Sequence, residues 1–130
     1  MGLGRFSMGI GDRFGRQGVA QLSALVAARQ EAIAVTPVWN KSHREHAIVG
    51  TAPADVRIEA DAAVGVTGWS DSYFVDADHI GLDNVDGFLE ASDFFTLDVA
   101  DFTGVAAPPD DLDAFVRKHG DLLGTWELPH

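Results

Sequence analysis

The sequence contains no cysteine, which excludes disulfide bonds and metal sites built on thiolates. Cationic residues are also scarce: 9 Lys and Arg residues stand against 20 Asp and Glu residues and leave a formal net charge of -11. A charge of this sign repels nucleic acids and anionic lipids, so we expect neither as a partner. Long apolar segments are missing as well, and we therefore expect no membrane association and a cytoplasmic location.

The residues that are present describe a folded α/β protein. Hydrophobic residues make up 46% of the 130 residues, which is enough for one packed core. Segments typical of strands alternate with segments typical of helices, and this alternation predicts a parallel sheet. The predicted strands are 5–10, 34–38, 73–77 and 94–99, and the predicted helices are 17–32, 53–66, 84–90 and 108–119.

The length sets the expected architecture. Polar residues gather after each predicted strand, where both doubly wound sheets and barrels place their sites. Neither G-x-G-x-x-G nor a P-loop follows the first strand, which weakens the nucleotide-binding alternative. A complete barrel needs about 250 residues. We therefore expect residues 1–130 to form the (βα)4 half of a TIM-type (βα)8 barrel, truncated at its C-terminus and completed by a missing C-terminal half or by self-association.

The segment YFVDADH, residues 73–79, carries the strongest signal for chemistry. If it is a strand, Asp76 and Asp78 point to the same side, because side chains alternate along a strand. Buried carboxylates are costly unless they are paired, hydrogen-bonded or bound to a metal. An imidazole and a carboxylate at a strand end suit a divalent metal with an adjacent base. The alternative is that Asp78 caps a turn and His79 lies in a solvated loop.

Two further segments carry candidate substrate contacts. Asp12 and Arg13 follow the first predicted strand, where Arg13 could bind a carboxylate bidentately. The alternative is a tight surface turn. Asn40, Lys41 and Arg44 belong to a polar segment, 39–46, that we expect after the second strand. These cations in an acidic protein suit a small anionic substrate, and the amide suits its hydroxyl groups.

Other polar and aromatic residues are weaker candidates. Asp98 follows the fourth predicted strand and is a further candidate substrate contact, whereas Asp101 is better explained as a turn cap. His43 and His46 have the spacing of metal ligands but no acidic third ligand at a recognised distance, so a loop or substrate contact fits them better. The apolar residues of the fourth strand are expected in the core: Phe94, Phe95 and Leu97.

Four segments together resemble the tagaturonate epimerase family. They are FSMGIGDRF at 6–14, TPVWNKS at 36–42, FVDADH at 74–79 and DFFTLDVAD at 93–101, and they follow the family's order over nearly the whole chain. The resemblance implies a metal-dependent epimerase with a barrel-like fold that interconverts tagaturonate and fructuronate in hexuronate catabolism. By its motifs it implies that Asp78 is the proton acceptor and His79 a metal ligand.

Family members are much longer, and the resemblance places the other metal ligands and the acidic proton donor in the part that is missing. We therefore expect this chain alone to be inactive. Two alternatives stay open. One is another metal-dependent isomerase or aldolase acting on a keto-sugar acid. The other is a non-catalytic half-barrel that self-associates through unpaired strand edges.

Overall fold

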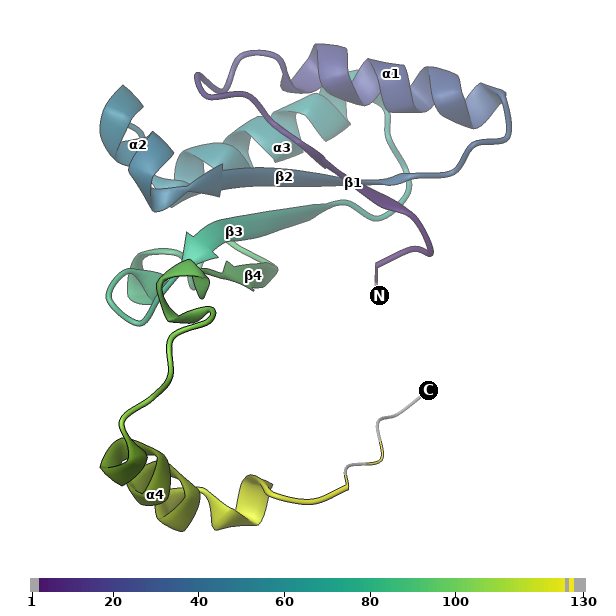
Figure 1. Ribbon diagram of the computed structural model, residues 1–130. Helices are drawn as coiled ribbons and strands as arrows, with labels where there is room; N and C mark the ends of the chain where they lie inside the picture. The colour runs from purple at the N-terminus through teal and green to yellow at the C-terminus, as the bar shows by residue number, and fades with distance from the viewer. Residues whose placement is uncertain (1–2, 126, 128–130) are drawn as a thin grey trace. The chain divides into compact units, whose positions relative to one another are not determined.

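The computed structural model describes residues 3–125 and 127 and confirms the predicted α/β fold (Figure 1). The contacts divide the chain into two units, Met1–Asp98 and Val99–His130. The first unit contains a parallel sheet in the order β1-β2-β3-β4. Its strands are β1 (Ser7–Ile10), β2 (Thr36–Ser42), β3 (Phe74–Ile80) and β4 (Phe94–Leu97).

The helices of the first unit cover one face of this sheet. Helices α1 (Gly18–Gln30) and α3 (Pro53–Thr67) pack side by side over it, and the short α2 (His43–Val49) follows β2 directly (Figure 1). The strands contribute Ile10, Trp39 and Val75 to the core beneath the helices. The helices contribute Leu22, Leu25, Val56, Ala60 and Ala63. Ile10, Trp39 and Val75 therefore form the apolar side of the sheet that packs against the helices.

The opposite face of the sheet, here called the open face, has a different composition. Side chains alternate along each strand, so the neighbours of Trp39 and Val75 point away from the helices. Asn40 lies beside Asp76 in the register of β2 and β3, and Asp76 lies beside Phe94 of β4. The rings of Phe74 and Phe94 are 6.4 Å apart. The open face comprises Gly9, Val38, Asn40, Phe74, Asp76, Phe94 and Thr96.

Local signals explain where the helices begin and end. Ser42 and Glu45 form a capping box that starts α2, and Gly50 ends it at a φ of 69°. Pro53 begins α3 and Gly68 ends it in the left-handed conformation, as the sequence predicts. Capping therefore places the start of α2 directly at the end of β2.

Several predicted boundaries were wrong. The polar segment expected at 39–46 does not form a loop, because β2 continues to Ser42 and its ladder with β3 continues with it. The predicted helix at 84–90 is only a 3-10 turn, Val85–Gly87. Leu97 is 68% exposed rather than part of the core, because β4 is the outer strand of the sheet. Phe94 and Phe95 are half-buried.

The second unit contains α4 (Pro109–Lys118) between two 3-10 turns, Ala100–Phe102 and Gly120–Leu122. Acidic residues occupy the first turn of α4 and basic residues its last turn, as expected for a helix dipole. The segment 122–130 lies partly outside the described residues. In the part of the chain that the structure describes, every helix is too short or too polar to cross a membrane.

Candidate functional site

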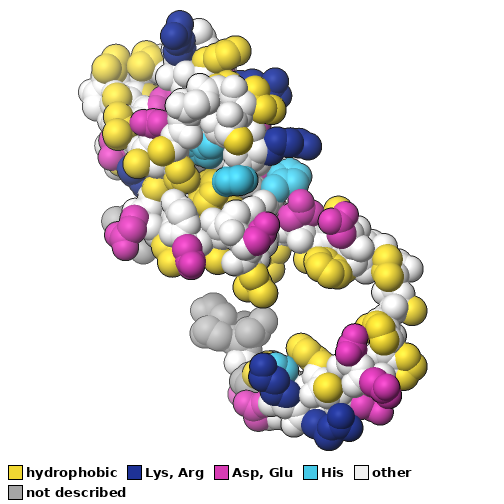
Figure 2. Space-filling view, turned by 90° about the vertical axis from the view of Figure 1, so that its left-hand side faces the viewer, with side chains coloured by type: hydrophobic (Ala, Val, Ile, Leu, Met, Phe, Trp, Pro, Cys, Tyr) yellow, Lys and Arg dark blue, Asp and Glu magenta, His cyan; other side chains and the backbone are white. Residues whose placement is uncertain are grey.

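A polar cavity lies where β2 and β3 end. Ser42, the last residue of β2, pairs in register with Asp78 of β3. Figure 2 views this end of the first unit, where histidine side chains gather beside cationic and acidic ones. The cavity has a volume of about 210 Å³ and is lined by Ser42, His43, Arg44, His79, Asn84 and Asp98. The lining therefore combines hydrogen-bonding groups, imidazoles, one cation and one carboxylate.

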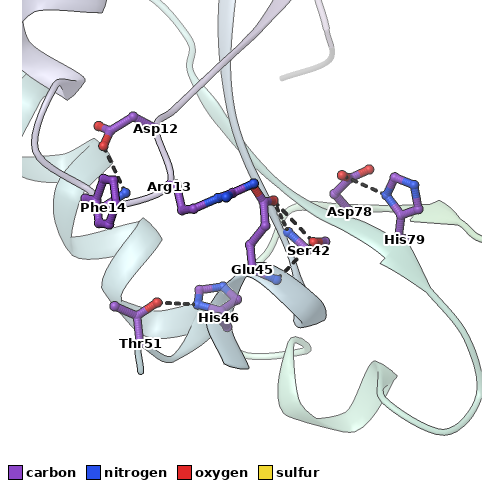
Figure 3. Close-up of polar contacts among 9 residues, drawn as sticks. All are labelled: Asp12, Arg13, Phe14, Ser42, Glu45, His46, Thr51, Asp78 and His79. Atoms are coloured by element: carbon purple, nitrogen blue, oxygen red, sulfur yellow. Dashed lines mark hydrogen bonds and ion pairs between the residues drawn. The ribbon is translucent and has the colours of Figure 1, made fainter. Parts of the chain in front are cut away.

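Asp78 and His79 are hydrogen-bonded to each other (Figure 3), and His79 lines this cavity. His79 Nδ1 lies 2.8 Å from Asp78 Oδ2. This hydrogen bond, together with the charge of Asp78, raises the pKa of His79. Because Nδ1 faces the carboxylate, Nε2 is the ring nitrogen that could bind a metal ion or a substrate. A carboxylate that orients an imidazole in this way is typical of histidines that bind metals.

The backbone at His79 is strained. Its φ is 56°, in the left-handed region that a residue with a side chain seldom adopts. The register between β3 and β4 also shifts between Ala77 and Ile80, as at a β-bulge. Bulges redirect side chains and occur often beside active sites. The bulge ends the regular alternation of β3, so His79 is not buried but reaches the cavity.

Asp76 lies two residues before Asp78, on the open face, and is only 7% exposed. Thr96 Oγ1 donates a hydrogen bond of 2.8 Å to Asp76 Oδ2. Oδ1 is buried and has no hydrogen-bond partner among the described residues. Burial is the main cause of the raised pKa of Asp76, and the nearby charge of Asp78 adds to it. Asp76 therefore has one buried carboxyl oxygen that the described residues leave without a hydrogen bond.

Asp12 organises the loop between β1 and α1. Its carboxylate accepts hydrogen bonds of 2.9, 2.9 and 2.7 Å from the backbone N–H groups of Phe14, Arg16 and Gln17. Burial acts to raise its pKa, but these hydrogen bonds outweigh burial and lower it. Arg13 Nε lies 3.8 Å from a carboxylate oxygen of Glu45 (Figure 3). These contacts support a structural role for Asp12, and substrate binding by Asp12 and Arg13 stays a prediction.

The start of α1 is also occupied by a carboxylate. Glu59 Oε1 of α3 accepts a hydrogen bond of 3.0 Å from the Gly18 N–H. A Cβ atom at Gly18 would lie 2.9 Å from the same oxygen, so only glycine allows this close approach. Phosphate-binding loops use such N–H groups for their ligand. Here the protein uses them internally, in agreement with the missing nucleotide motif.

The three candidate substrate contacts near the end of β2 lie in different places: Asn40, Lys41 and Arg44. Arg44 lines the cavity and acts electrostatically on His79. Asn40 is exposed on the open face. Lys41 is the next residue of β2 after Asn40, so its side chain points to the helix-covered face, where it is 5% exposed. Its positive charge acts to lower the pKa of Glu45 and of Glu59. Roles for all three in substrate binding stay predictions.

The sequence did not single out Asn84, which lines the cavity and whose side-chain oxygen accepts a 3.1 Å hydrogen bond from the Gly81 N–H. The GLDN turn after β3 was the available signal. The two histidines of α2 separate: His43 lines the cavity, whereas His46 is buried with Nδ1 2.9 Å from Thr51 Oγ1. Burial lowers the pKa of His46.

The described residues do not complete a metal site. Among them, no group of three His, Asp or Glu side chains lies close enough to hold one ion. His79 offers one imidazole with an orienting carboxylate, and Asp98 adds negative charge nearby. Metal binding by His79 therefore stays a prediction, and the described residues alone do not offer a complete set of ligands.

Comparisons with solved structures give related proteins of known activity. The chain is 26% identical, with a TM-score of 0.63, to the fructuronate-tagaturonate epimerase UxaE of Cohnella laeviribosi in a crystal structure with one glycerol. This match covers 95% of this chain and 24% of that chain. A structure of the same enzyme with two glycerols gives 21% identity, a TM-score of 0.62, and coverage of 87% and 26%. The chain thus spans about a quarter of the length of these solved proteins.

The same structures agree with a (βα)4 half-barrel: four parallel strands that alternate with helices along the chain and match one portion of a larger protein. No functionally curated protein matches the sequence. The sequence model of the UxaE family, described as tagaturonate epimerase, matches residues 1–121. The chain therefore belongs to the UxaE family of tagaturonate epimerases.

Proposed function

We propose that this chain supplies the proton acceptor and one metal ligand of an epimerase that interconverts tagaturonate and fructuronate in hexuronate catabolism. The observation that carries the proposal is the Asp78–His79 pair at a polar cavity, in a chain of this family. A second part of the proposal concerns the remaining metal ligands, because no group of three His, Asp or Glu side chains among the described residues could hold an ion. The chain alone is inactive, and a complementing polypeptide provides the remaining ligands and the proton donor.

The proposed reaction inverts C4 of a keto-hexuronate whose ketone is at C2. Asp78 accepts the proton of the C4 hydroxyl, and the C3–C4 bond breaks to give an aldehyde at C4 and an enediolate at C2–C3. The aldehyde rotates and the bond re-forms on its other face, which returns the proton to the C4 oxygen. Direct proton exchange at C4 is the weaker route, because the C2 ketone does not stabilise a carbanion there.

Arg44 is the best candidate in this chain for binding the substrate carboxylate, since it is the cation among the residues that line the cavity. Asp98, which lines the cavity, and Asn40, which lies on the open face, are the further candidates for hydrogen bonds to substrate hydroxyls. The pairing of Arg13 with Glu45 and the burial of Lys41 favour structural roles for those two cations. A bound divalent cation would supply Lewis-acid stabilisation of negative charge on substrate oxygens.

A chimeric enzyme tests the proposal. This chain would replace the matching segment of the Cohnella laeviribosi epimerase, and conversion of tagaturonate to fructuronate would be followed by chromatography with added divalent metal. We expect conversion by the chimera and none by this chain alone. A chimera that unfolds cooperatively but converts no substrate would contradict the proposal. Release of an aldehyde without the epimer would favour an aldolase instead.

A further inference from the structure

Asn84 lines the same cavity as His79, and the oxygen of its side-chain amide is already occupied. Oδ1 accepts a hydrogen bond of 3.1 Å from the Gly81 N–H. The Gly81 carbonyl in turn accepts hydrogen bonds from the N–H groups of Asn84 at 3.3 Å and Val85 at 3.1 Å. Because a backbone N–H must face the oxygen and not the nitrogen of the amide, these contacts hold the Asn84 amide in one orientation.

The turn that contains Asn84 is anchored to the end of the strand that carries His79. The Ile80 carbonyl accepts a hydrogen bond of 3.0 Å from the Asp98 N–H. The N–H of the same peptide unit, which belongs to Gly81, donates to Asn84 Oδ1. Both polar groups of this peptide are therefore bound, and Asn84 is tied to the backbone two residues after His79.

The nitrogen of the Asn84 amide is the group that this arrangement leaves for a ligand. Among the described residues, Nδ2 donates no hydrogen bond, and the side chain is half-buried at the cavity. The Ser42 hydroxyl is another neutral donor of the lining, but it is engaged in the capping box with Glu45. His43 and Arg44 are exposed. Asn84 therefore gives this cavity a neutral donor whose direction the fold fixes.

The chemistry of the amide decides which substrate oxygen suits it. An amide whose oxygen is occupied offers two N–H donors and no acceptor. A hydroxyl group both donates and accepts, so it is better matched to the carboxylate of Asp98. The substrate carboxylate is better matched to the cation of Arg44. The C2 ketone oxygen only accepts and carries no full charge before the reaction, so it is the oxygen that fits Asn84 Nδ2.

We propose that Asn84 is a further catalytic residue, whose Nδ2 donates a hydrogen bond to the C2 oxygen of the substrate. The inference rests on the proposed function and deepens it. When Asp78 takes the proton of the C4 hydroxyl, the C4 oxygen forms the aldehyde carbonyl and the C3–C4 bond breaks. The electrons of that bond form a C2–C3 double bond, and negative charge develops on the C2 oxygen.

The hydrogen bond from Asn84 then strengthens without any transfer of its proton. When the C3–C4 bond re-forms, the C2 carbonyl is restored and the C4 oxygen takes its proton back from Asp78. A preorganised donor at an oxygen that gains charge lowers the barrier more than it strengthens substrate binding. Loss of the Asn84 donor should therefore lower kcat much more than it raises KM.

Two substitutions in the chimeric enzyme separate the donor from the turn. Asn84→Asp keeps an oxygen for the Gly81 N–H but removes the Nδ2 donor and adds a charge. Asn84→Ala removes donor and acceptor and adds no charge. We expect kcat for the consumption of tagaturonate to fall about 10²-fold in both variants, since both lack the donor. The melting temperature should fall only in Asn84→Ala.

A matched control isolates the effect of the added charge. Leu82 belongs to the same turn and is 99% exposed, so Leu82→Asp introduces a carboxylate without changing the amide. We expect it to leave kcat unchanged. The consumption of tagaturonate is the readout whether the product is the epimer or an aldehyde, because both routes pass through the same enediolate.

The possible outcomes distinguish the inference from the proposed function. In an active parent chimera, a loss of kcat in Asn84→Ala alone would reduce Asn84 to a residue that holds the turn and would overturn the inference. A loss in Asn84→Asp alone would assign the effect to charge and would also overturn it. A higher KM with unchanged kcat would do the same. A folded parent that consumes no tagaturonate would instead overturn the proposed function, and this inference with it.

Discussion

The two faces of the sheet differ in how well their side chains are buried and hydrogen-bonded within the described part of the chain. On the helix-covered face, Trp39 and Val75 lie in a closed apolar core under α1 and α3. One residue further along the same strands, Asn40 is exposed and Asp76 has an oxygen without a partner among the described residues. The helix-covered face thus stabilises the fold, whereas the open face and the strand ends hold the polar groups that are candidates for function.

This difference follows from strand alternation. Because neighbouring residues point to opposite faces, a single strand can combine core residues with reactive ones. In β3, Val75 and Ala77 pack while Asp76 and Asp78 do not. The bulge after Ala77 then adds His79 to the polar candidate residues. Substitutions on the two faces should accordingly have effects of different size and sign.

The largest expected effect is on the helix-covered face. Trp39 is fully buried, and Trp39→Ala should lower the free energy of unfolding by about 3–5 kcal/mol, because it leaves a large cavity. Asn40→Ala, one residue along on the open face, should change it by no more than about 0.5 kcal/mol. Urea unfolding followed by tryptophan fluorescence and circular dichroism measures both. Equal losses would mean that the two faces do not differ as described.

A smaller loss of unfolding free energy is expected from a substitution at Asp93, which links α3 to β3. Asp93 Oδ2 accepts hydrogen bonds from the Val75 N–H at 2.7 Å and from Arg57 Nη2 at 2.6 Å. Asp93→Ala should cost about 1–3 kcal/mol of unfolding free energy, since it leaves the Val75 N–H unsatisfied. Asp86→Ala removes the same charge from an exposed turn and is the matched control. Similar stability of the two variants would argue against this link.

On the open face, a substitution is expected to raise the free energy of unfolding instead of lowering it. Asp76→Asn removes a charge that is only partly paired, so it should raise the free energy of unfolding by about 1 kcal/mol at neutral pH. The pKa of Asp76 in the fold is raised above its ordinary value of 3.8. Protonated Asp76 therefore contributes its full share of the folding stability below pH 3.8. That contribution is lost as the pH rises through the pKa that Asp76 has in the folded protein.

The difference between wild type and Asp76→Asn should therefore be small in acid and largest at neutral pH. Thermal unfolding over a pH series measures it. A variant that is less stable than wild type at neutral pH would show that the carboxylate is already satisfied within the chain.

The smallest expected effect comes from the strained backbone at His79. His79→Gly should raise the free energy of unfolding by about 0.5 kcal/mol, because glycine adopts a φ of 56° without strain. Ala32→Gly, at a φ of 61°, should give a similar gain and serves as the control. Only His79→Gly should weaken binding of a divalent metal in the chimeric enzyme. Equal metal affinities for both variants would argue against His79 as a ligand.

The sequence predicts much of the fold because its signals are local. Strand and helix alternation, Pro53 at the start of α3 and Gly68 at its end all depend on neighbouring residues. The length of β2 depends instead on pairing with β3 as far as Asp78, and the exposure of Leu97 depends on β4 being an outer strand. Tertiary contacts of this kind are not visible in local patterns.

The candidate site likewise has features that the sequence predicts and features that depend on tertiary contacts. The placement of Asp78 and His79 at a strand end could be predicted from the FVDADH segment alone. The bulge, the left-handed φ of His79 and the entry of Asn84 into the cavity could not, because they depend on how β3 meets β4 and on the turn between them. The direction of Lys41 could not be predicted either, because it depends on the extension of β2 to Ser42.

The central claim is that Asp78 is the proton acceptor, and the turnover number of the chimeric epimerase tests it most directly. Asp78→Asn keeps the size of the side chain but removes the base, so kcat should fall by about 10²–10⁴-fold while KM changes little. Asp86→Asn in the same chimera should leave kcat unchanged. A folded Asp78→Asn chimera whose kcat stays near that of its parent would contradict the account.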